Sequence, residues 1–471
     1  MINNNLKEKI EKFKKKLLDL NNQNEIIEKN IFLNIFFFPK NHPEYFAKYK
    51  KINRSYAYLI SLIFYNIFLS IKDLLKIILK TNTRINKIIN SKYDFIVFSH
   101  YLSSKHSFSN DIYFRSFLEL LKKNNLSYLL VYTPATKEGT YDNLEDTKKE
   151  IFLKKKLNFK NELIIFFKII KLIYFYLSLK KLLLKEKLVI CGEALNQETF
   201  KNFRMYFQIQ KLFENVNFNN LITTFEGLNL EKIIFSLSKE NNCKKNIGYQ
   251  HAPIIKNHTS VFEFQKTKYF PDLILTSGQF YKKLFLEKIK NKKILNYGTN
   301  KFIFKNINFI KKKNYCLVLP EAIYSECKIL FNFSKLYLEN FDDFKFIWRA
   351  HPMMKMDEIL KNLKLNNDIM KNIEISKNED DDFLKSKFCL FRGSSSVFNA
   401  IHYKCYPVYL NFEKEFNINP LYNLREIDYV DNIKSLNKIF KKTDLNSISI
   451  IKKEILNYFK KPELDLSKIL K

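Results

Sequence analysis

Glycine and tryptophan are scarce in this chain: 471 residues contain 7 Gly and 1 Trp, against 46 Phe. Neither GxxxxGK[ST] nor GxGxxG occurs. This argues against a P-loop nucleotidase or an ordinary dinucleotide-binding domain, whose glycines let the backbone approach phosphates. Most of the glycines stand within or at the end of short apolar runs, where we expect sharp turns or close backbone approach. These are Gly192, Gly227, Gly248, Gly278, Gly298 and Gly393.

The cysteines form no pattern that a metal or a disulfide framework requires. Six are present, far apart in the sequence and without a CxxC pair, so neither a zinc site nor a set of disulfides is indicated. Residues 1–16 are charged and polar and lack the apolar core of a secretory signal. We therefore expect a reducing, cytoplasmic environment.

Long uninterrupted apolar runs are also missing. The longest, residues 57–71, is broken by Asn66 and falls short of the roughly 20 residues that a membrane span needs. It predicts a buried or an interfacial helix. A second stretch, residues 162–184, mixes aromatic residues with lysines. That pattern fits a helix on an anionic bilayer and fits equally a helix packed on a sheet with its lysines reaching into water.

The charge is strongly one-sided, with 81 Lys plus Arg against 48 Asp plus Glu and a formal net charge of +33. Such a charge fits a nucleic acid or an anionic membrane surface as a partner. However, the lysines are spread along the whole chain and no nucleic-acid-binding motif accompanies them. An AT-rich genome explains the abundance of Lys, Asn, Ile and Phe. We predict no nucleic-acid partner, and an anionic inner-membrane surface stays open.

Short apolar runs alternate with helical patterns from about residue 91 onward, which is typical of parallel sheets covered on both faces. The expected strands cover residues 93–98, 128–132, 188–191, 221–225, 246–249, 273–276, 294–297, 315–319, 345–348, 388–391 and 407–410.

The length exceeds what one core usually supports, so two domains with attached helices are expected. We predict an α/β protein with two doubly wound, Rossmann-like domains facing a cleft and an N-terminal helical extension. The predicted parts are the extension 1–90, a first domain 91–300 that binds the acceptor, a linker 301–314, a donor-binding domain 315–430, and C-terminal helices 431–471 that pack back.

A serine-rich turn follows one of the expected strands. Arg392, Gly393, Ser394, Ser395 and Ser396 join the strand at 388–391 to a helical pattern. Amides and hydroxyls at such a turn can hold a phosphate without a metal. A single serine would suffice to cap the helix, so three serines after Arg-Gly favour phosphate binding. Glu321 stands at the end of the strand at 315–319 and is assigned to the same donor-binding edge.

An Arg and a His end another expected strand. Arg349 and His351 are two residues apart, so they project to the same side, and Pro352 fixes the exit of the chain. Together they can bind an anionic leaving group and protonate it as it departs. A purely structural histidine is the alternative.

Carboxylate and imidazole groups end two strands of the first predicted domain. Glu226 follows the strand at 221–225, where it can deprotonate an acceptor hydroxyl. Glu231 fits better as an acid near a helix N-terminus. Gln250 and His251 close the next strand and, with Gly278, are assigned to the acceptor side or the rim of the cleft.

The acidic run 379–382 resembles a metal-binding motif, but it precedes a short helix, where acids interact favourably with the dipole. We predict no metal and no cofactor.

These motifs resemble those of GT-B glycosyltransferases of bacterial surface carbohydrate (polysaccharide) biosynthesis, and they are similar to bacterial sialyltransferases and Kdo transferases. Sialyltransferases share an acidic-Gly motif, an HP motif and a serine-pair motif, matched in order by Glu226-Gly227, His351-Pro352 and Ser394 to Ser396. The resemblance covers about residues 90–425. One departure is Phe225, where sialyltransferases often have a second acid.

The basic, aromatic stretches leave open a peripheral position on the inner face of the cytoplasmic membrane. The resemblance implies a metal-independent enzyme that moves a sugar from a nucleotide-sugar donor, such as a CMP-activated nonulosonic acid, to a glycan or lipid-linked glycan. It implies Glu226 as general base, with His351 and the serines on the donor phosphate. Alternatives are a CDP-glycerol-type polyol-phosphate transferase, a nucleotide-sugar 2-epimerase, and a non-catalytic membrane-associated scaffold.

Overall fold

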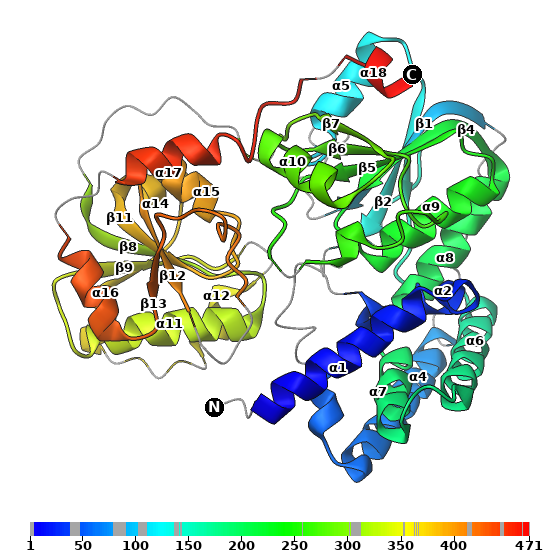
Figure 1. The fold of residues 1–471 in the computed structure, drawn as a ribbon, viewed down its shortest axis with the longest axis horizontal. Helices are drawn as coiled ribbons and strands as arrows, with labels where there is room; N and C mark the ends of the chain where they lie inside the picture. The colour runs from blue at the N-terminus through cyan, green and yellow to red at the C-terminus, as the bar shows by residue number, and fades with distance from the viewer. Residues whose placement is uncertain are drawn as a thin grey trace.

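Two α/β domains stand side by side, with a bundle of helices next to the first one (Figure 1). The computed structural model describes residues 4–37, 48–78, 91–101, 111–135, 141, 144–256, 258–300, 302, 312–351, 354–361, 363, 365, 367–411, 417–442, 447–463 and 465–470. Within these residues the chain forms one sheet of seven strands and one of six, and every strand pairing is parallel. The predicted fold class is confirmed.

The first sheet has the strand order β3-β2-β1-β4-β5-β6-β7. Its central strands are buried along most of their length, which explains why the sequence shows apolar runs without alternation. The strands are β1 (Ser91–Tyr101), β2 (Tyr128–Pro134), β3 (Glu150–Phe152), β4 (Val216–Thr224), β5 (Lys245–Gln250), β6 (Leu273–Thr276) and β7 (Lys293–Asn296). The helices of this domain are α5 (Arg115–Lys123), α8 (Gln197–Asn215), α9 (Asn229–Glu240) and α10 (Gln279–Lys288).

The second sheet has the order β10-β9-β8-β11-β12-β13. Counted within each domain, both sheets begin with the Rossmann order 3-2-1-4-5-6. The strands are β8 (Lys313–Leu319), β9 (Lys345–Trp348), β10 (Ile373–Ile375), β11 (Ser386–Phe391), β12 (Tyr406–Leu410) and β13 (Asp428–Val430). The helices are α11 (Tyr324–Leu338), α12 (Met356–Leu360), α13 (Asn367–Met370), α14 (Glu379–Lys385), α15 (Val397–His402) and α16 (Ile433–Phe440). Most of the predicted linker, residues 301 and 303–311, lies outside the described residues.

The helices before β1 belong to a bundle that also takes in helices from later in the chain. The members are α1 (Asn4–Asn21), α2 (Asn24–Asn30), α4 (Tyr56–Ile78), α6 (Phe159–Ser178) and α7 (Leu184–Ala194). Both α6 and α7 contact α4. The described helices of the predicted extension 1–90 are therefore one part of this bundle and not a separate unit, because α6 and α7, inserted between β3 and β4, pack on α4.

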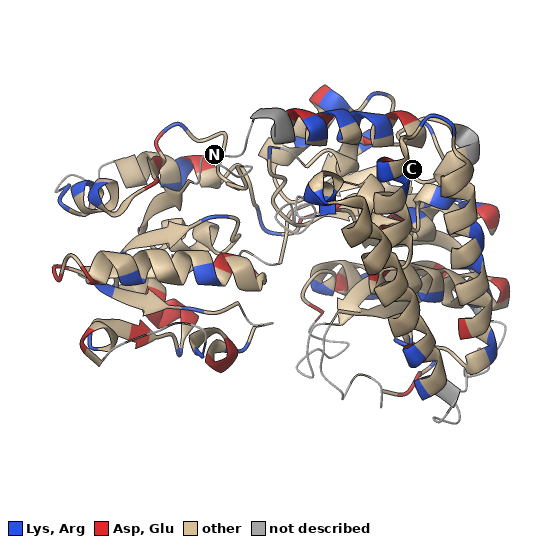
Figure 2. Cartoon of the chain, turned by 90° about the horizontal axis from the view of Figure 1, so that it is seen from below, with Lys and Arg blue, Asp and Glu red and all other residues tan. Residues whose placement is uncertain are grey.

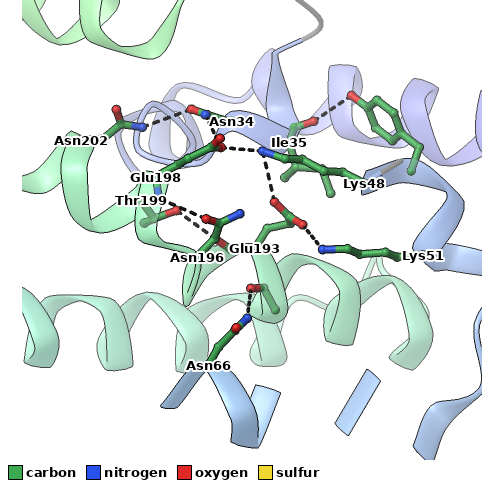
Figure 3. A network of polar contacts seen from close by, with 12 residues as sticks. Asn34, Ile35, Lys48, Lys51, Asn66, Glu193, Asn196, Glu198, Thr199 and Asn202 are labelled. Carbon is green, nitrogen blue, oxygen red and sulfur yellow. Dashed lines mark hydrogen bonds and ion pairs between the residues drawn. The ribbon is translucent and has the colours of Figure 1, made fainter. Parts of the chain in front are cut away.

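A polar network joins the N-terminal segment to the end of α7 and the start of α8 (Figure 3). Lys48 lies 2.5 Å from Glu198 and 3.6 Å from Glu193, and Lys51 lies 2.6 Å from Glu193. Asn66 of α4 donates to the carbonyl of Gly192 at 3.2 Å. The Asn66 bond ties α4 to α7, and the two lysines tie the segment before α4 to α7 and α8.

One predicted strand is wrong. Residues 188–191 belong to helix α7, and Gly192 lies inside that helix and does not end a strand. Residues 189–194 are all buried, so this part of α7 has no polar stripe that would show a helical period. An apolar run followed by glycine then looks the same as a buried strand.

The C-terminal segment crosses from the second domain back to the first. Helix α17 (Ser447–Ile455) contacts α15, and α18 (Ser467–Leu470) places Ile469 in the core of the first sheet. Between these helices Tyr458 stacks on Phe280 with ring centroids 4.1 Å apart. Backbone hydrogen bonds, such as that from the amide of Thr299 to the carbonyl of Lys460 at 2.8 Å, hold the segment on the first domain.

Candidate functional site

A cavity of about 410 Å³ lies at the carboxyl-terminal edge of the second sheet. The ends of three strands and the segments that follow them line it: residues 319–322 at the end of β8, 349–351 after β9 and 393–396 after β11. The strand order reverses between β8 and β11, and this switch point is where Rossmann-type sheets bind ligands. The volume lies in the range of small-molecule sites.

Apart from Arg392, the cavity brings together the residues that the sequence assigned to donor binding, together with the predicted catalytic His351. They are Glu321, Arg349, His351, Gly393, Ser394, Ser395 and Ser396. Arg349 and His351 both line it, as their two-residue spacing predicted. Pro352 lies outside the described residues. Ile112 and Phe302, which lie outside the second sheet, complete the wall.

The serine turn is closed locally. The hydroxyl of Ser394 accepts a hydrogen bond from the amide of Ser396 at 3.4 Å, and Ser394 is buried. Ser396 precedes α15 without capping it through its side chain, and it is half-buried beside the cavity. Its hydroxyl is therefore placed to meet a ligand.

Arg392 has a structural role, which corrects its part in the predicted phosphate motif. Its Nε lies 2.6 Å from the carboxylate of Glu326, and both side chains are 1% exposed. Its Nη1 donates to the carbonyl of Leu410 at 3.1 Å. A guanidinium that is enclosed and paired in this way points into the core and away from the cavity.

The acidic run at the start of α14 holds Arg349. The guanidinium lies 3.1 Å from Glu379 and 3.6 Å from Asp382, and it donates to the hydroxyl of Ser376 at 3.1 Å. Burial raises the pKa of Asp382. The described residues contain no group of three or more His, Cys, Asp or Glu side chains that could hold a metal. The run orients a cation at the cavity wall.

Glu321 approaches the serine turn because Gly393 has no side chain. A Cβ on Gly393 would clash with the carboxylate of Glu321. Glu321 and Glu379 therefore share the cavity with Arg349 and His351. A wall with both signs of charge can accept hydrogen bonds from ribose or sugar hydroxyls and also donate to an anion.

A second cluster lies at the matching edge of the first sheet, where the strand order reverses between β1 and β4. Glu226 follows β4, and its Oε1 lies 3.5 Å from Nε2 of His251, which follows β5. Tyr113 meets the His251 ring edge to face, with centroids 4.6 Å apart. The carboxylate of Glu226 is 21% exposed and the His251 side chain is 7% exposed, so the carboxylate is the part that a ligand can reach.

His100, the second-last residue of β1, lies beside this cluster, with its ring centroid 5.9 Å from that of Tyr113. Its Nδ1 lies 2.7 Å from the hydroxyl of Thr133 and its Nε2 lies 3.2 Å from that of Thr224. Burial lowers the pKa of His100 to about 4, so the ring is neutral at pH 7. The sequence analysis gave His100, which lies two residues beyond the expected strand at 93–98, no role. Tyr113 was missed because it lies in a loop without a motif.

Glu231 fixes the turn that carries Glu226. Its two carboxylate oxygens accept hydrogen bonds from the amide of Glu226 at 2.8 and 2.9 Å, and one also accepts from the amide of Leu228 at 3.0 Å. Burial and the charge of Glu226 raise the pKa of Glu231 to about 8. Gly227 has φ +73°, and a Cβ there would clash with the backbone at Ser260. The turn at residues 226–228 is therefore fixed by the Glu231 carboxylate and by the backbone at Ser260.

The cavity and the second cluster adjoin, but Glu226 does not line the cavity. Ile112 lines it, and the next residue, Tyr113, contacts His251. Of the residues that the resemblance assigns to catalysis and to the donor phosphate, His351 and the serines therefore line one cavity, and Glu226 lies outside it.

Two residues assigned to the cleft rim have structural roles instead. Gln250 is buried, and its side chain donates to the carbonyl of Ala252 at 2.5 Å and accepts from the amide of Ser277 at 3.1 Å. A Cβ on Gly278 would clash with the carbonyl of Tyr458. Gln250 ties β5 to β6, and Gly278 makes room for the returning C-terminal segment.

Comparisons with known proteins do not assign a family. No family model matches the chain. A DNA-directed RNA polymerase subunit beta'' of Bigelowiella natans is 24% identical over 351 residues, which is 63% of this chain, and the chain spans 22% of that relative's length.

Three solved structures show the level of likeness. The UDP-GlcNAc 2-epimerase from Methanocaldococcus jannaschii is 15% identical with a TM-score of 0.41, covering 75% of this chain and 94% of its own. The calicheamicin glycosyltransferase CalG4 is 10% identical with a TM-score of 0.45, covering 77% and 94%. The glycosyltransferase SnogD from Streptomyces nogalater is 8% identical with a TM-score of 0.43, covering 81% and 99%. At these scores the fold assignment rests on the strand orders of the two sheets.

Proposed function

We propose that this protein is a metal-independent glycosyltransferase that transfers a sugar from a nucleotide donor to a glycan acceptor. The observation that supports the proposal is the cavity at the β8/β11 switch point, where hydroxyls, an imidazole, a guanidinium and carboxylates converge. A nucleotide sugar presents an anionic phosphate beside ribose and sugar hydroxyls. Each of these groups has a complementary partner in the cavity wall.

The reaction exchanges one bond at the anomeric carbon. The acceptor hydroxyl oxygen attacks this carbon, and the bond to the donor phosphate oxygen breaks. Glu226 takes the acceptor proton. His351 and the serine hydroxyls stabilise the departing phosphate, and His351 supplies it with a proton. Glu379 and Asp382 hold Arg349 toward the same group. For Glu226 to reach the anomeric carbon, the two domains must close.

The specific donor we propose is a CMP-activated nonulosonic acid. The acceptor is a glycan on a lipid or polysaccharide carrier, and the enzyme works in the cytoplasm at the inner face of the membrane. The donor and acceptor come from the order of the acidic-Gly, HP and serine motifs in the sequence. The location comes from the cysteine pattern, the polar N-terminus and the excess of basic residues.

A thermal-shift screen against CMP, CDP, UDP and GDP tests donor binding, because a ligand that binds the folded form raises the Tm. We expect CMP to raise it most. Ser396→Asp places a carboxylate beside the cavity and should abolish the shift by repelling the phosphate. Ser467→Asp, at an exposed position of α18, is the matched control and should keep it. If none of the four nucleotides raises the Tm, the proposal fails and the scaffold alternative stands.

Product analysis by NMR separates the enzymatic alternatives. UDP-GlcNAc incubated without an acceptor should be stable or slowly hydrolysed. Its conversion to the C2 epimer would replace the transferase by an epimerase. A Tm shift by CDP alone, with glycerol phosphate transfer from CDP-glycerol, would replace sugar transfer by polyol-phosphate transfer.

A further inference from the structure

The outward side of α4 is apolar, although most of it faces solvent in the described structure. Phe64 is 67% exposed and Phe68 is 61% exposed. The same side carries further exposed aromatic and aliphatic residues, namely Tyr58, Ile60, Tyr65, Ile71 and Leu75. A helix on the surface of a water-soluble domain normally turns its polar side outward. Helix α4 instead turns its apolar side outward.

The inward side of α4 explains why the apolar side stays outside. Leu59, Ser70 and Leu74 are buried against the bundle. Asn66 donates to the Gly192 carbonyl of α7 (Figure 3), and Asp73 accepts from Gln197 at 3.1 Å. These contacts lie along one side of the helix, so rolling it to bury the phenylalanines would break them.

Helix α6 extends the apolar surface. It contacts α4 and α7, and its outward residues include Tyr174, 77% exposed, and Phe167, 56% exposed. Leu183 and Leu184, at the start of α7, are 65% and 59% exposed. Most of the large apolar side chains that are exposed in the described residues belong to these helices. We call this surface, made by α4, α6 and residues 183–184, the α4–α6 face.

Cations surround the α4–α6 face, and its acids are mostly neutralised. In the view from below in Figure 2, the nearby helices on the right are mainly tan and blue. Glu162 is buried against Arg204 at 2.8 Å, and Glu186 pairs with Lys16 at 2.8 Å. Exposed basic residues of α4, of α6 and of the segment between α6 and α7 include Lys72, Lys76, Lys160, Lys171, Lys180 and Lys181.

We propose that the α4–α6 face binds the surface of an anionic phospholipid bilayer and lies in its interface. Exposed aromatic and aliphatic side chains flanked by lysines are the composition of helices that rest in the headgroup region. The lysine stems reach past the apolar side chains to the lipid phosphates. The face gives the protein a fixed orientation on the membrane and does not depend on the proposed reaction.

A transmembrane orientation of α4 fits less well. Its residues 56–76 are long and apolar enough to cross a bilayer. However, crossing would separate Asn66 and Asp73 from their partners on α7 and α8 and would bring Lys72 and Asp73 near the hydrocarbon. A second copy of the chain is also less favoured, because two identical faces would bring their lysines together.

Vesicle co-sedimentation of the full chain tests the proposal. Wild-type protein should bind vesicles that contain phosphatidylglycerol, bind phosphatidylcholine vesicles less, and lose affinity as salt rises. Phe64→Glu combined with Phe68→Glu should lower the partition coefficient about tenfold or more, because two apolar side chains no longer enter the interface. Phe167→Glu combined with Tyr174→Glu should act in the same direction.

Leu336→Glu combined with Ile450→Glu is the matched control, since both residues are exposed apolar residues of helices in the second domain. It should bind vesicles like wild type. All variants should keep the wild-type circular dichroism spectrum and Tm, since the replaced side chains are exposed.

Several results would overturn the proposal. One is wild-type protein that stays in the supernatant with anionic vesicles, and another is an equal loss of binding in the control variant. Protein that resists alkaline carbonate extraction from bacterial membranes would instead show a span. A concentration-dependent dimer that Phe64→Glu with Phe68→Glu abolishes, without vesicle binding, would identify a second copy as the occupant. Because no donor is present, failure here leaves the proposed function untouched.

Discussion

The carboxyl-terminal edges of the two sheets have the same strand order around the switch point but differ in what occupies it. At the second sheet the edge is hollowed by a cavity of about 410 Å³ with a glycine and three serines in its wall. At the first sheet Tyr113 and His251 pack on each other, and the half-buried His100 contacts Tyr113 edge to face.

The difference shows that topology fixes where a ligand site can be, whereas side-chain volume decides whether there is room for a ligand. Gly393 leaves space that Glu321 and the cavity share. In the first domain aromatic rings fill the corresponding space, so one carboxylate, that of Glu226, stays within reach of a ligand. Under the proposed function, donor binding therefore belongs to the second edge and deprotonation of the acceptor hydroxyl to the first.

The largest expected effect separates these two roles. Glu226→Gln should lower the rate of transfer about 10²- to 10⁴-fold, as expected for loss of a general base, and leave the nucleotide-induced Tm shift intact. His351→Ala should lower transfer by a similar factor and also reduce that shift. Single-turnover kinetics and thermal shift on both variants check this. Loss of nucleotide binding in Glu226→Gln would break the division between the two edges.

Two glycines give the next comparison. Gly278→Ala forces a methyl group against the backbone of the returning segment, so we expect a loss of about 3 kcal/mol in the free energy of unfolding. Gly393→Ala meets the movable end of the Glu321 side chain, so its loss should be about 1 kcal/mol or less. Urea denaturation of both variants measures this. Equal losses of unfolding free energy in the two variants would contradict the prediction, because they would mean that the Glu321 side chain cannot move away from the added methyl group.

The pH dependence of stability should come from the first edge. Burial, with the charge of Glu226, raises the pKa of Glu231 from 4.5 to about 8. The carboxyl of Glu231 therefore binds its proton more tightly in the folded protein than in the unfolded chain. The stabilisation that this gives is lost as the pH rises through about 8. His100, with its pKa lowered by burial from 6.5 to about 4, acts in the opposite direction, because its contribution is lost as the pH falls below 6.5.

Between pH 6.5 and 8, Glu231 changes the free energy of unfolding with pH, whereas His100 changes it little, because its ring is mostly neutral in both the folded and the unfolded state there. Glu231→Gln should flatten the decline of the free energy of unfolding in this window, by no more than about 2 kcal/mol. Urea denaturation at a series of pH values gives the slope. An unchanged slope would show that another group titrates there.

The smallest effect concerns Arg349, whose partners are partly exposed. Arg349→Lys keeps the charge but cannot reach Glu379, Asp382 and Ser376 together, so we expect a loss of less than about 1 kcal/mol in stability. A weaker Tm shift with nucleotide should accompany it. A stability loss well above this value would make Arg349 a structural residue, comparable to Arg392.

Strands in the sheet interiors were predictable because both faces are buried. The expected strands at 273–276 and 345–348 coincide with β6 and β9. The strands β3, β10 and β13 were missed. All three are edge strands of three residues. An edge strand pairs with one neighbouring strand only, and a strand this short does not produce an apolar run that can be recognised in the sequence.

The site was predictable as far as it consists of strand ends. Arg349, His351 and the serines each follow a strand, and parallel strands end at one edge. The sequence could not show that Arg392 turns inward to Glu326, that Gln250 is used inside the protein, or that Gly278 faces the C-terminal segment. Each of these depends on a contact between residues distant in the chain.

The amino-acid sequence by itself determined the two parallel sheets and the grouping of polar residues at their edges, because burial on both faces requires apolar runs and turns carry the remaining polar groups. Only the tertiary structure decided that one switch point is open and the other filled, and that α4 turns its phenylalanines outward. Both outcomes depend on contacts between side chains that are far apart in the sequence, and a local sequence pattern does not show such contacts.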